Sequence, residues 1–279
     1  MSSQPAPTDE GPNEAMDASA AAPDLSRNDG HRRGDHKHEA ETPGLGGLKA
    51  RRSLWKVLLV RAGWLVVVAA LVPMDGAIRE PVQRVHESLG GDIRRELRAY
   101  SQFGGLTSVV LIGLVIVLLD QAKSARLWDL VLSMASASLV TTALKILIGR
   151  TRPRFETPEH FLGFWDSMPT SMDAEPIYSW QLWAKAPAEF WSMPSGHSSA
   201  AFALATFLAL TYPRIRWVVF GVAAVVPISR LTADAHWAAD VVLGSCIGAW
   251  VASAVTRRGL GRRLAGRVGL LRAGPAAGG

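Results

Sequence analysis

Six long apolar runs constrain the fold of this chain more than any other feature of its sequence. A helix that crosses a bilayer needs about 20 mostly apolar residues, and runs near that length recur from residue 54 onward. The second and fourth runs are shorter and need flanking small residues to complete a span. We therefore expect an all-α, polytopic membrane helix bundle of about six transmembrane helices, and a soluble two-domain protein is disfavoured. The runs are roughly Leu54–Pro73, Leu106–Leu119, Leu127–Ile148, Ser198–Thr211, Trp217–Thr232 and Trp237–Val255.

The N-terminal segment, residues 1–53, has a different composition. It holds nine acidic and seven basic residues, with no aromatic residue and no Ile, Val or Phe. A segment this polar cannot bury a core, so we predict a disordered tail, with its histidines (His31, His36 and His38) solvated. The expected organisation is a polar tail (1–53), a transmembrane domain (54–256) and a basic C-terminal tail (257–279).

Basic residues near the span ends predict the orientation of the bundle. They flank the spans at 49–56, 123–126, 214–216 and 257–272, all on the side that carries both termini. The long loop 149–196 on the other side has six acidic and only four basic residues. We therefore expect both termini to be cytoplasmic.

Residues 75–101 form a separate pattern between the first two spans. Five basic and five acidic residues balance there, and apolar residues recur every three or four positions from Val82 to Tyr100. This predicts an amphipathic helix that lies on the membrane surface or against the bundle. We expect an interruption or bend near Gly90 and Gly91.

Three short motifs adjoin the spans on the predicted outer side. They are Lys145…Arg152-Pro153, Pro194-Ser195-Gly196-His197, and Ser229-Arg230…His236…Asp240. Each has a structural explanation if taken alone: a snorkelling lysine with arginines at headgroups, an N-cap serine, and a histidine at a helix start. Together they collect three cations, two histidines and one acid at one membrane face.

The third motif places His236 and Asp240 one helical turn apart. A carboxylate at that distance can accept the imidazole N–H, fix its tautomer and leave the other nitrogen free to attack. A Ser-Gly pair that enters a helix can turn backbone N–H groups toward an anion. These motifs therefore favour chemistry on an anionic group such as a phosphate.

The three motifs, with their spacing, resemble the signature of the type 2 phosphatidic acid phosphatase superfamily, which is related to bacterial acid phosphatases and vanadium haloperoxidases. The resemblance covers residues from about 54 to 256. It implies that His236 is the nucleophile, held by Asp240, and that His197 is the general acid and base. Lys145, Arg152 and Arg230, with the Ser195 hydroxyl and the Gly196 N–H, would bind the phosphate.

No metal and no other cofactor is expected, because two histidines and one acid surrounded by cations would repel a divalent ion. The expected partners are a lipid phosphate substrate and the bilayer, with the oligomeric state left open. The net charge of +6 does not predict a nucleic-acid partner, since the basic residues lie at span ends and after Thr256, where anionic lipid explains them. The loops, the absence of a signal peptide and the resemblance together favour a bacterial inner membrane, with the active site on the periplasmic side.

The expected function is metal-independent hydrolysis of a lipid phosphate monoester or pyrophosphate through a phosphohistidine. Phosphatidic acid, phosphatidylglycerol phosphate, isoprenyl pyrophosphate and phosphorylated glycolipids all remain open as substrates. The alternatives are a phosphotransferase that uses the same histidine and a catalytically silent transporter or scaffold; peroxidase chemistry is disfavoured. The aromatic-rich loop 154–193 predicts an interfacial anchor or a lid over a lipid tail.

Overall fold

The computed structural model describes residues 45–153, 161–168, 177–181 and 191–270. Residues 1–48 and 49–279 form two separate units, and every contact below lies within the second. The helices are α1 (Leu45–Leu71), α2 (Asp75–Ser88), α3 (Gly91–Tyr100), α4 (Leu106–Leu119), α5 (Leu127–Ile148), α6 (Gly196–Thr211), α7 (Arg216–Thr232), α8 (Ala238–Arg258) and α9 (Leu260–Arg267). Shorter elements are the 3-10 turns η1 (Val72–Met74), η2 (Gln121–Arg126) and η5 (Pro213–Ile215), and the antiparallel strands β1 (Ser167–Met168) and β2 (Ile177–Tyr178).

The predicted all-α architecture is confirmed, and each of the six apolar runs forms a helix. Four helical segments are long and apolar enough to cross a membrane: Trp55–Ser88, Gln121–Ile148, Pro213–Thr232 and Ala238–Arg258. The other two apolar helices, α4 and α6, are shorter. The prediction of six spans is therefore not confirmed in its count.

Two predicted boundaries differ from the structure. α1 begins at Leu45 rather than at Leu54, because the residues before the apolar run include several good helix formers; residues 1–44 of the predicted tail lie outside the described part. At the other end α8 continues to Arg258, and α9 follows at once. The backbone N–H and Nε of Arg262 both donate to the Asp129 carboxylate at the start of α5, so the first part of the basic C-terminal segment packs on the bundle.

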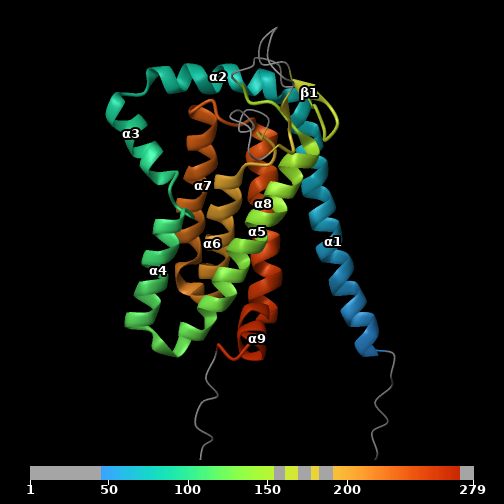
Figure 1. Ribbon diagram of the computed structural model, residues 1–279, viewed down its shortest axis with the longest axis vertical. Helices are drawn as coiled ribbons and strands as arrows, with labels where there is room; N and C mark the ends of the chain where they lie inside the picture. The colour runs from blue at the N-terminus through green and yellow to red at the C-terminus, as the bar shows by residue number, and fades with distance from the viewer. Residues whose placement is uncertain (1–44, 154–160, 169–176, 182–190, 271–279) are drawn as a thin grey trace, which may run out of the picture. The chain divides into compact units, whose positions relative to one another are not determined.

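Helix α6 is the central element, in contact with α5, α7 and α8 (Figure 1). Glycines let α8 approach it closely. A Cβ atom at Gly244 would lie 2.3 Å from the carbonyl oxygen of Ser195, and one at Gly248 would lie 2.0 Å from that of Ser199. Small residues four positions apart are a common device for close helix packing in membranes, and here they bring α8 against the start of α6.

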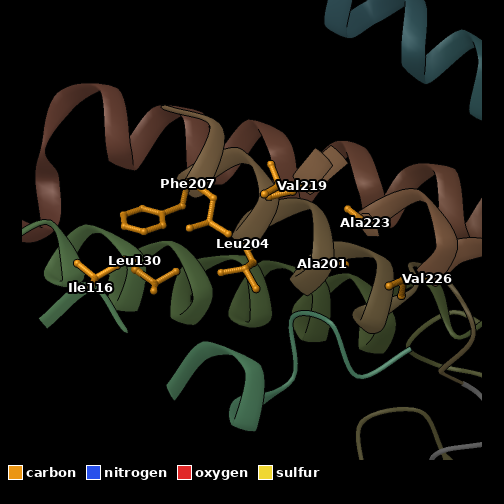
Figure 2. Close-up of a cluster of buried hydrophobic side chains, with 10 residues drawn as sticks. Ile116, Leu130, Ala201, Leu204, Phe207, Val219, Ala223 and Val226 are labelled. Carbon is orange, nitrogen blue, oxygen red and sulfur yellow. The ribbon is translucent and has the colours of Figure 1, made fainter. Parts of the chain in front are cut away.

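A cluster of buried apolar side chains holds α4, α5, α6 and α7 together (Figure 2). Leu204 and Phe207 on α6 lie at its centre and are fully buried, while large apolar residues on the outer surfaces remain exposed, for example Leu139 on α5 and Val218 on α7. Outward-facing apolar side chains on helices of this length suit a lipid environment.

The predicted amphipathic segment forms two helices, α2 and α3, separated by Leu89 and Gly90 in extended conformation. The expected interruption near the glycine pair is thus confirmed. α2 lies across the end of the bundle, and α3 descends beside α7 (Figure 1). The Arg79 guanidinium on α2 binds both carboxylate oxygens of Asp234 at 2.9 and 2.7 Å, which ties α2 to the end of α7.

Candidate active site

The three motifs meet around one cavity of about 400 Å³ at this end of the bundle. α5 ends there, α6 begins there, and the segment between α7 and α8 passes beside it. Six residues predicted from the sequence line the cavity, in company with Ser101, Phe103 and Gly104 from the segment after α3. The six are Lys145, Arg152, Gly196, His197, Arg230 and His236.

Arg152 reaches the cavity because α5 stops sharply before it. Gly149 takes the left-handed conformation that ends the helix, with φ at +56°, and its N–H donates to the carbonyl of Lys145. A side chain at this position would also meet the Gly163 carbonyl at 2.7 Å. Only glycine satisfies both conditions without strain, so this residue turns the chain from the membrane helix into the site.

His236 is buried, with 4% of its surface exposed, and its Nδ1 lies 2.8 Å from the backbone carbonyl of Ser192. A carbonyl only accepts hydrogen bonds, so the neutral imidazole carries its proton on Nδ1 and keeps a lone pair on Nε2. Burial lowers the pKa of His236 from 6.5 to about 4, which keeps the ring neutral near pH 7.

Asp240 does not make the hydrogen bond expected from the helical spacing. Its Oδ2 atom lies 3.8 Å from His236 Nδ1, beyond hydrogen-bonding distance. The carboxylate accepts instead from Arg150 Nη1 at 2.8 Å, from the Ser192 hydroxyl and from the Trp237 N–H at 2.9 Å. Asp240 therefore has no direct hydrogen bond to His236; it binds the hydroxyl of Ser192, and the backbone carbonyl of the same residue accepts the imidazole N–H.

Arg150 continues this buried network to α2. Its Nη2 atom lies 2.8 Å from Asp75 Oδ2, and Asp75 Oδ1 accepts the N–H of Ala239 at 3.0 Å. Both ion pairs of Arg150 are fully buried. Neither Asp75 nor Ser192 was predicted from the sequence, and Arg150 was noted only as one of a group of basic residues. The buried network thus positions the histidine through residues from four segments of the chain.

Ser195 takes a different place from the one expected. The Ser195 hydroxyl is buried and accepts from the N–H and hydroxyl of Ser198, as the N-cap of α6. Its own N–H donates to the carbonyl of Asp240 at 2.9 Å. Ser195 therefore orients the start of α6, whereas Gly196 and His197 line the cavity. The start of α6 is a favourable place for an anion, since its free N–H groups and helix dipole both point there.

The cavity is strongly cationic. The Lys145 ammonium donates to the carbonyl of Trp191, and Arg230 Nη1 lies 3.5 Å from Nε2 of the exposed His197. The Nε atom of Arg230 is buried without a hydrogen-bond partner among the described residues. Those residues include no group of three or more His, Cys, Asp or Glu side chains placed to hold a metal ion. The lining suits a multiply charged oxyanion.

A second, more apolar groove of about 330 Å³ continues from the cavity between α4, α5 and α6. The two share Lys145 and Gly196, among other residues. Farther along, the groove is lined mainly by apolar or small residues, namely Leu106, Val109, Met134 and Ala135. The cationic cavity thus opens into an apolar groove.

The aromatic loop is described in part. Phe164 packs edge-on against Trp165, and Tyr178 stacks on Trp180 beside the β1–β2 hairpin. Trp191 Nε1 donates to the carbonyl of Ser179 at 2.9 Å, which links this group to the segment that holds Lys145. Trp183 and Phe190 lie outside the described residues, and the predicted lid stays a prediction.

Several known proteins are similar to this chain. Two lipid A 1-phosphatases, from Rhizobium johnstonii and Rhizobium etli, are 30% and 31% identical to it over 118 and 116 residues. Each match covers 41% of this chain but only 40% and 42% of the relative. A transmembrane PAP2 type phosphatidylglycerolphosphate phosphatase from Bacillus subtilis matches with a TM-score of 0.49 and 20% identity, over 73% of this chain and 94% of that one.

The family model of the PAP2 superfamily matches residues 126–263. This range runs from the start of α5 to α9 and includes every residue of the three motifs, from Lys145 to Asp240. By this match residues 126–263, which form the helices from α5 to α9, belong to the PAP2 superfamily.

Proposed function

We propose that the protein is an integral-membrane phosphatase that hydrolyses a lipid phosphate without a metal, through a phosphohistidine at His236. The observation that carries this proposal is the hydrogen bond from His236 Nδ1 to the Ser192 carbonyl. It leaves Nε2 as the basic nitrogen of a histidine that lines a cationic cavity. A neutral imidazole held in a fixed tautomer is the form a nucleophilic histidine needs.

The cations and the start of α6 supply the binding of the phosphate. Lys145, Arg152 and Arg230 line the cavity, and arginines can bind phosphate oxygens through two N–H groups at once. These charges also stabilise the transition state, in which charge is spread over the equatorial oxygens. Ser195 is left out of this group, because its hydroxyl caps α6 instead.

The reaction takes two steps. His236 Nε2 forms a bond to phosphorus as the bond to the lipid oxygen breaks, and His197 donates a proton to that leaving oxygen. Water then attacks the phosphohistidine, His197 accepts the proton, and phosphate leaves with His236 restored. Desolvation and, after it, the charge of Arg230 lower the pKa of His197 to about 4. The charge of a bound phosphate opposes this effect, so His197 is protonated only in the substrate complex.

The groove between α4, α5 and α6 supports a lipid substrate rather than a soluble one. It begins at the cationic cavity and continues along apolar side chains, which can hold an acyl chain while the phosphate stays at His236. The curated relatives are named lipid A 1-phosphatases, and we propose a phosphorylated glycolipid of that class as the first substrate to test. The site would lie on the periplasmic side of a bacterial inner membrane, with both termini cytoplasmic.

The test is phosphate release by the detergent-purified protein and its His236→Ala variant, with a chelator present. The panel holds a phosphorylated glycolipid, phosphatidic acid, phosphatidylglycerol phosphate, an isoprenyl pyrophosphate and a soluble phosphomonoester. We expect the wild type to release phosphate from at least one lipid and the variant to release none. We also expect an acid-labile phosphoryl group to label the wild-type protein but not the variant. Full turnover by His236→Ala would refute the nucleophile. Loss of lipid phosphate only when an alcohol acceptor is added would show a phosphotransferase instead.

A further inference from the structure

A second cavity, of about 370 Å³, lies between α2, α3 and the end of α7. Its polar lining comes mainly from the two amphipathic helices. Ser229 and Thr232 of α7 and Asp234, which follows α7, complete it. None of the three sequence motifs accounts for the residues that α2 and α3 place there. This pocket therefore has no role in the mechanism described above.

The cavity has a basic character. His86, Arg94 and Arg98 line it, and the one carboxylate among its lining residues is Asp234. Asp234 is already paired, because Arg79 holds both of its oxygens. In the described part of the chain no carboxylate forms an ion pair with Arg94 or Arg98, whereas the neighbouring Arg95 pairs with Asp92 at 2.9 Å. Within the described ranges, no acidic side chain thus balances the positive charge of Arg94 and Arg98.

Two nitrogen atoms of these side chains are buried without a hydrogen-bond partner among the described residues. They are His86 Nδ1 and Arg94 Nε. Buried polar atoms in folded proteins are nearly always hydrogen-bonded, and an unpaired one calls for a water, an ion or a ligand group. Both lie on residues that line the same cavity.

The basic cavity adjoins the active site along two chain segments. Ser229 lines the basic cavity and Arg230, the next residue, lines the catalytic one. Arg98 lines the basic cavity and Ser101 lines the catalytic one, and the Ser101 hydroxyl donates to the carbonyl of Arg98. The two cavities therefore adjoin along both of these segments.

We propose that this basic cavity, formed by His86, Arg94 and Arg98, is a second anion site that binds a phosphate-class group while another phosphate lies at His236. The proposal rests on the proposed function for the identity of the lipid. The group is either a second phosphate on the same lipid or the phosphate of a neighbouring anionic lipid. Both present the same chemistry to the arginines, and the experiment separates them.

The experiment measures equilibrium binding in the His236→Ala background, which stops turnover. The protein is placed in phosphatidylcholine nanodiscs, and the probes are a synthetic glycolipid with one phosphate and its counterpart with two. We expect the doubly phosphorylated probe to bind about tenfold more tightly, as one added charge-assisted contact would give. In the Arg94→Gln/Arg98→Gln variant the ratio of the two dissociation constants should fall to about one. Arg95→Gln, which removes one positive charge from the same helix at a residue that does not line the cavity, should keep the parent ratio.

A second arm adds phosphatidylglycerol to the nanodiscs and uses the singly phosphorylated probe. Tighter binding that depends on Arg94 and Arg98 would support the site and assign the anion to a neighbouring lipid. A ratio unchanged in the double variant, with no effect of phosphatidylglycerol, would overturn the proposal, and so would equal weakening of both probes. If the wild type releases no phosphate but the ratio still depends on these arginines, the anion site stands and the proposed catalysis fails.

Discussion

Asp75 and Arg150 form an ion pair of 2.8 Å with both side chains fully buried, although 75 residues separate them in the sequence. Arg150 binds Asp240 with its other terminal nitrogen. The pair therefore joins α2 to the Asp240 carboxylate, which lies beside the proposed nucleophile His236. Such a contact also explains why α2 lies across the end of the bundle rather than apart from it.

Removal of the charge on Arg150 should destabilise the protein strongly. Arg150→Met leaves two buried carboxylates without their cation, and the loss of one partner from a buried pair typically costs about 3–5 kcal/mol. We expect a marked fall in the thermal unfolding temperature in detergent. Arg95→Gln removes an exposed pair and should change the free energy of unfolding by less than about 1 kcal/mol. Equal melting of Arg150→Met and the wild type would contradict the structural role.

Variants of Ser192 and Asp240 distinguish a carbonyl from a carboxylate as the partner of the histidine. Ser192→Ala keeps the backbone carbonyl that binds His236 Nδ1 and removes only a hydroxyl bound to Asp240. We expect kcat to fall by no more than about tenfold, a cost of about 1.4 kcal/mol. Asp240→Asn disturbs Arg150, Ser192 and Trp237 together and should lower kcat by more than 100-fold. A loss in Ser192→Ala as large as in Asp240→Asn would contradict this division.

The pH dependence follows from the burial of His236. Its pKa is lowered to about 4, so the imidazole loses its nucleophilic lone pair only as the pH falls through that region. The acid limb of kcat/KM, which reports groups of the free enzyme, should lie near pH 4 rather than 6.5. The same shift lowers stability in acid, because the unfolded chain takes up this proton from pH 6.5 downward and the folded protein does not until about pH 4. An acid limb centred at 6.5 would argue against a buried neutral histidine.

Substitutions at two glycines should have opposite effects on stability. Gly248→Ala places a Cβ atom 2.0 Å from the Ser199 carbonyl, so α6 and α8 must separate, and we expect a loss of several kcal/mol. Gly221→Ala on α7 meets nothing within 4 Å and should leave stability unchanged or raise it by up to about 1 kcal/mol. Thermal melting of both variants in the same detergent provides the comparison. A stable Gly248→Ala protein would mean that the two helices pack differently.

A bulky residue in the apolar groove should separate lipid from soluble substrates. Ala135→Phe narrows the groove beside the catalytic cavity, so KM should rise several-fold for a long-chain lipid phosphate and stay unchanged for a soluble phosphomonoester. Leu139→Phe changes an exposed residue one helical turn away on α5, which does not line the groove, and serves as the control. An equal effect of Ala135→Phe on both substrates would count against an acyl-chain site.

The sequence predicted the membrane helices well because each is a continuous apolar run with charged or proline-containing ends. α4 and α5 have the predicted bounds, and the break between α2 and α3 falls beside the predicted glycine pair. The start of α1 and the position of α9 were missed, since the hydropathy of a polar segment does not show whether it extends a helix or packs on one. The contact of Gly261 and Arg262 with the start of α5 has no sequence signal of its own.

Most of the predicted site residues line the cavity, but the residues that hold them in place were not predicted from the sequence. The partner of His236 is a backbone carbonyl, which any residue at position 192 would supply, so no residue type marks it. Asp75 lies on α2, a helix that the sequence predicted only as an amphipathic surface element, and its carboxylate accepts the N–H of Ala239. One missed feature did have a signal, because Gly244 and Gly248 form a small-residue pair at the spacing used for close helix contacts in membranes.

The span of 164 residues between Asp75 and its backbone partner Ala239 also sets the order in which the protein can become active. The ribosome makes Asp75 early, whereas His236 and Asp240 emerge only with the last apolar helix. Until that helix has entered the bilayer, the nascent chain has the cations that we propose bind phosphate but lacks the proposed nucleophile. If His236 acts as proposed, the chain is inserted in a chemically inert form and becomes reactive only once α8 is in place.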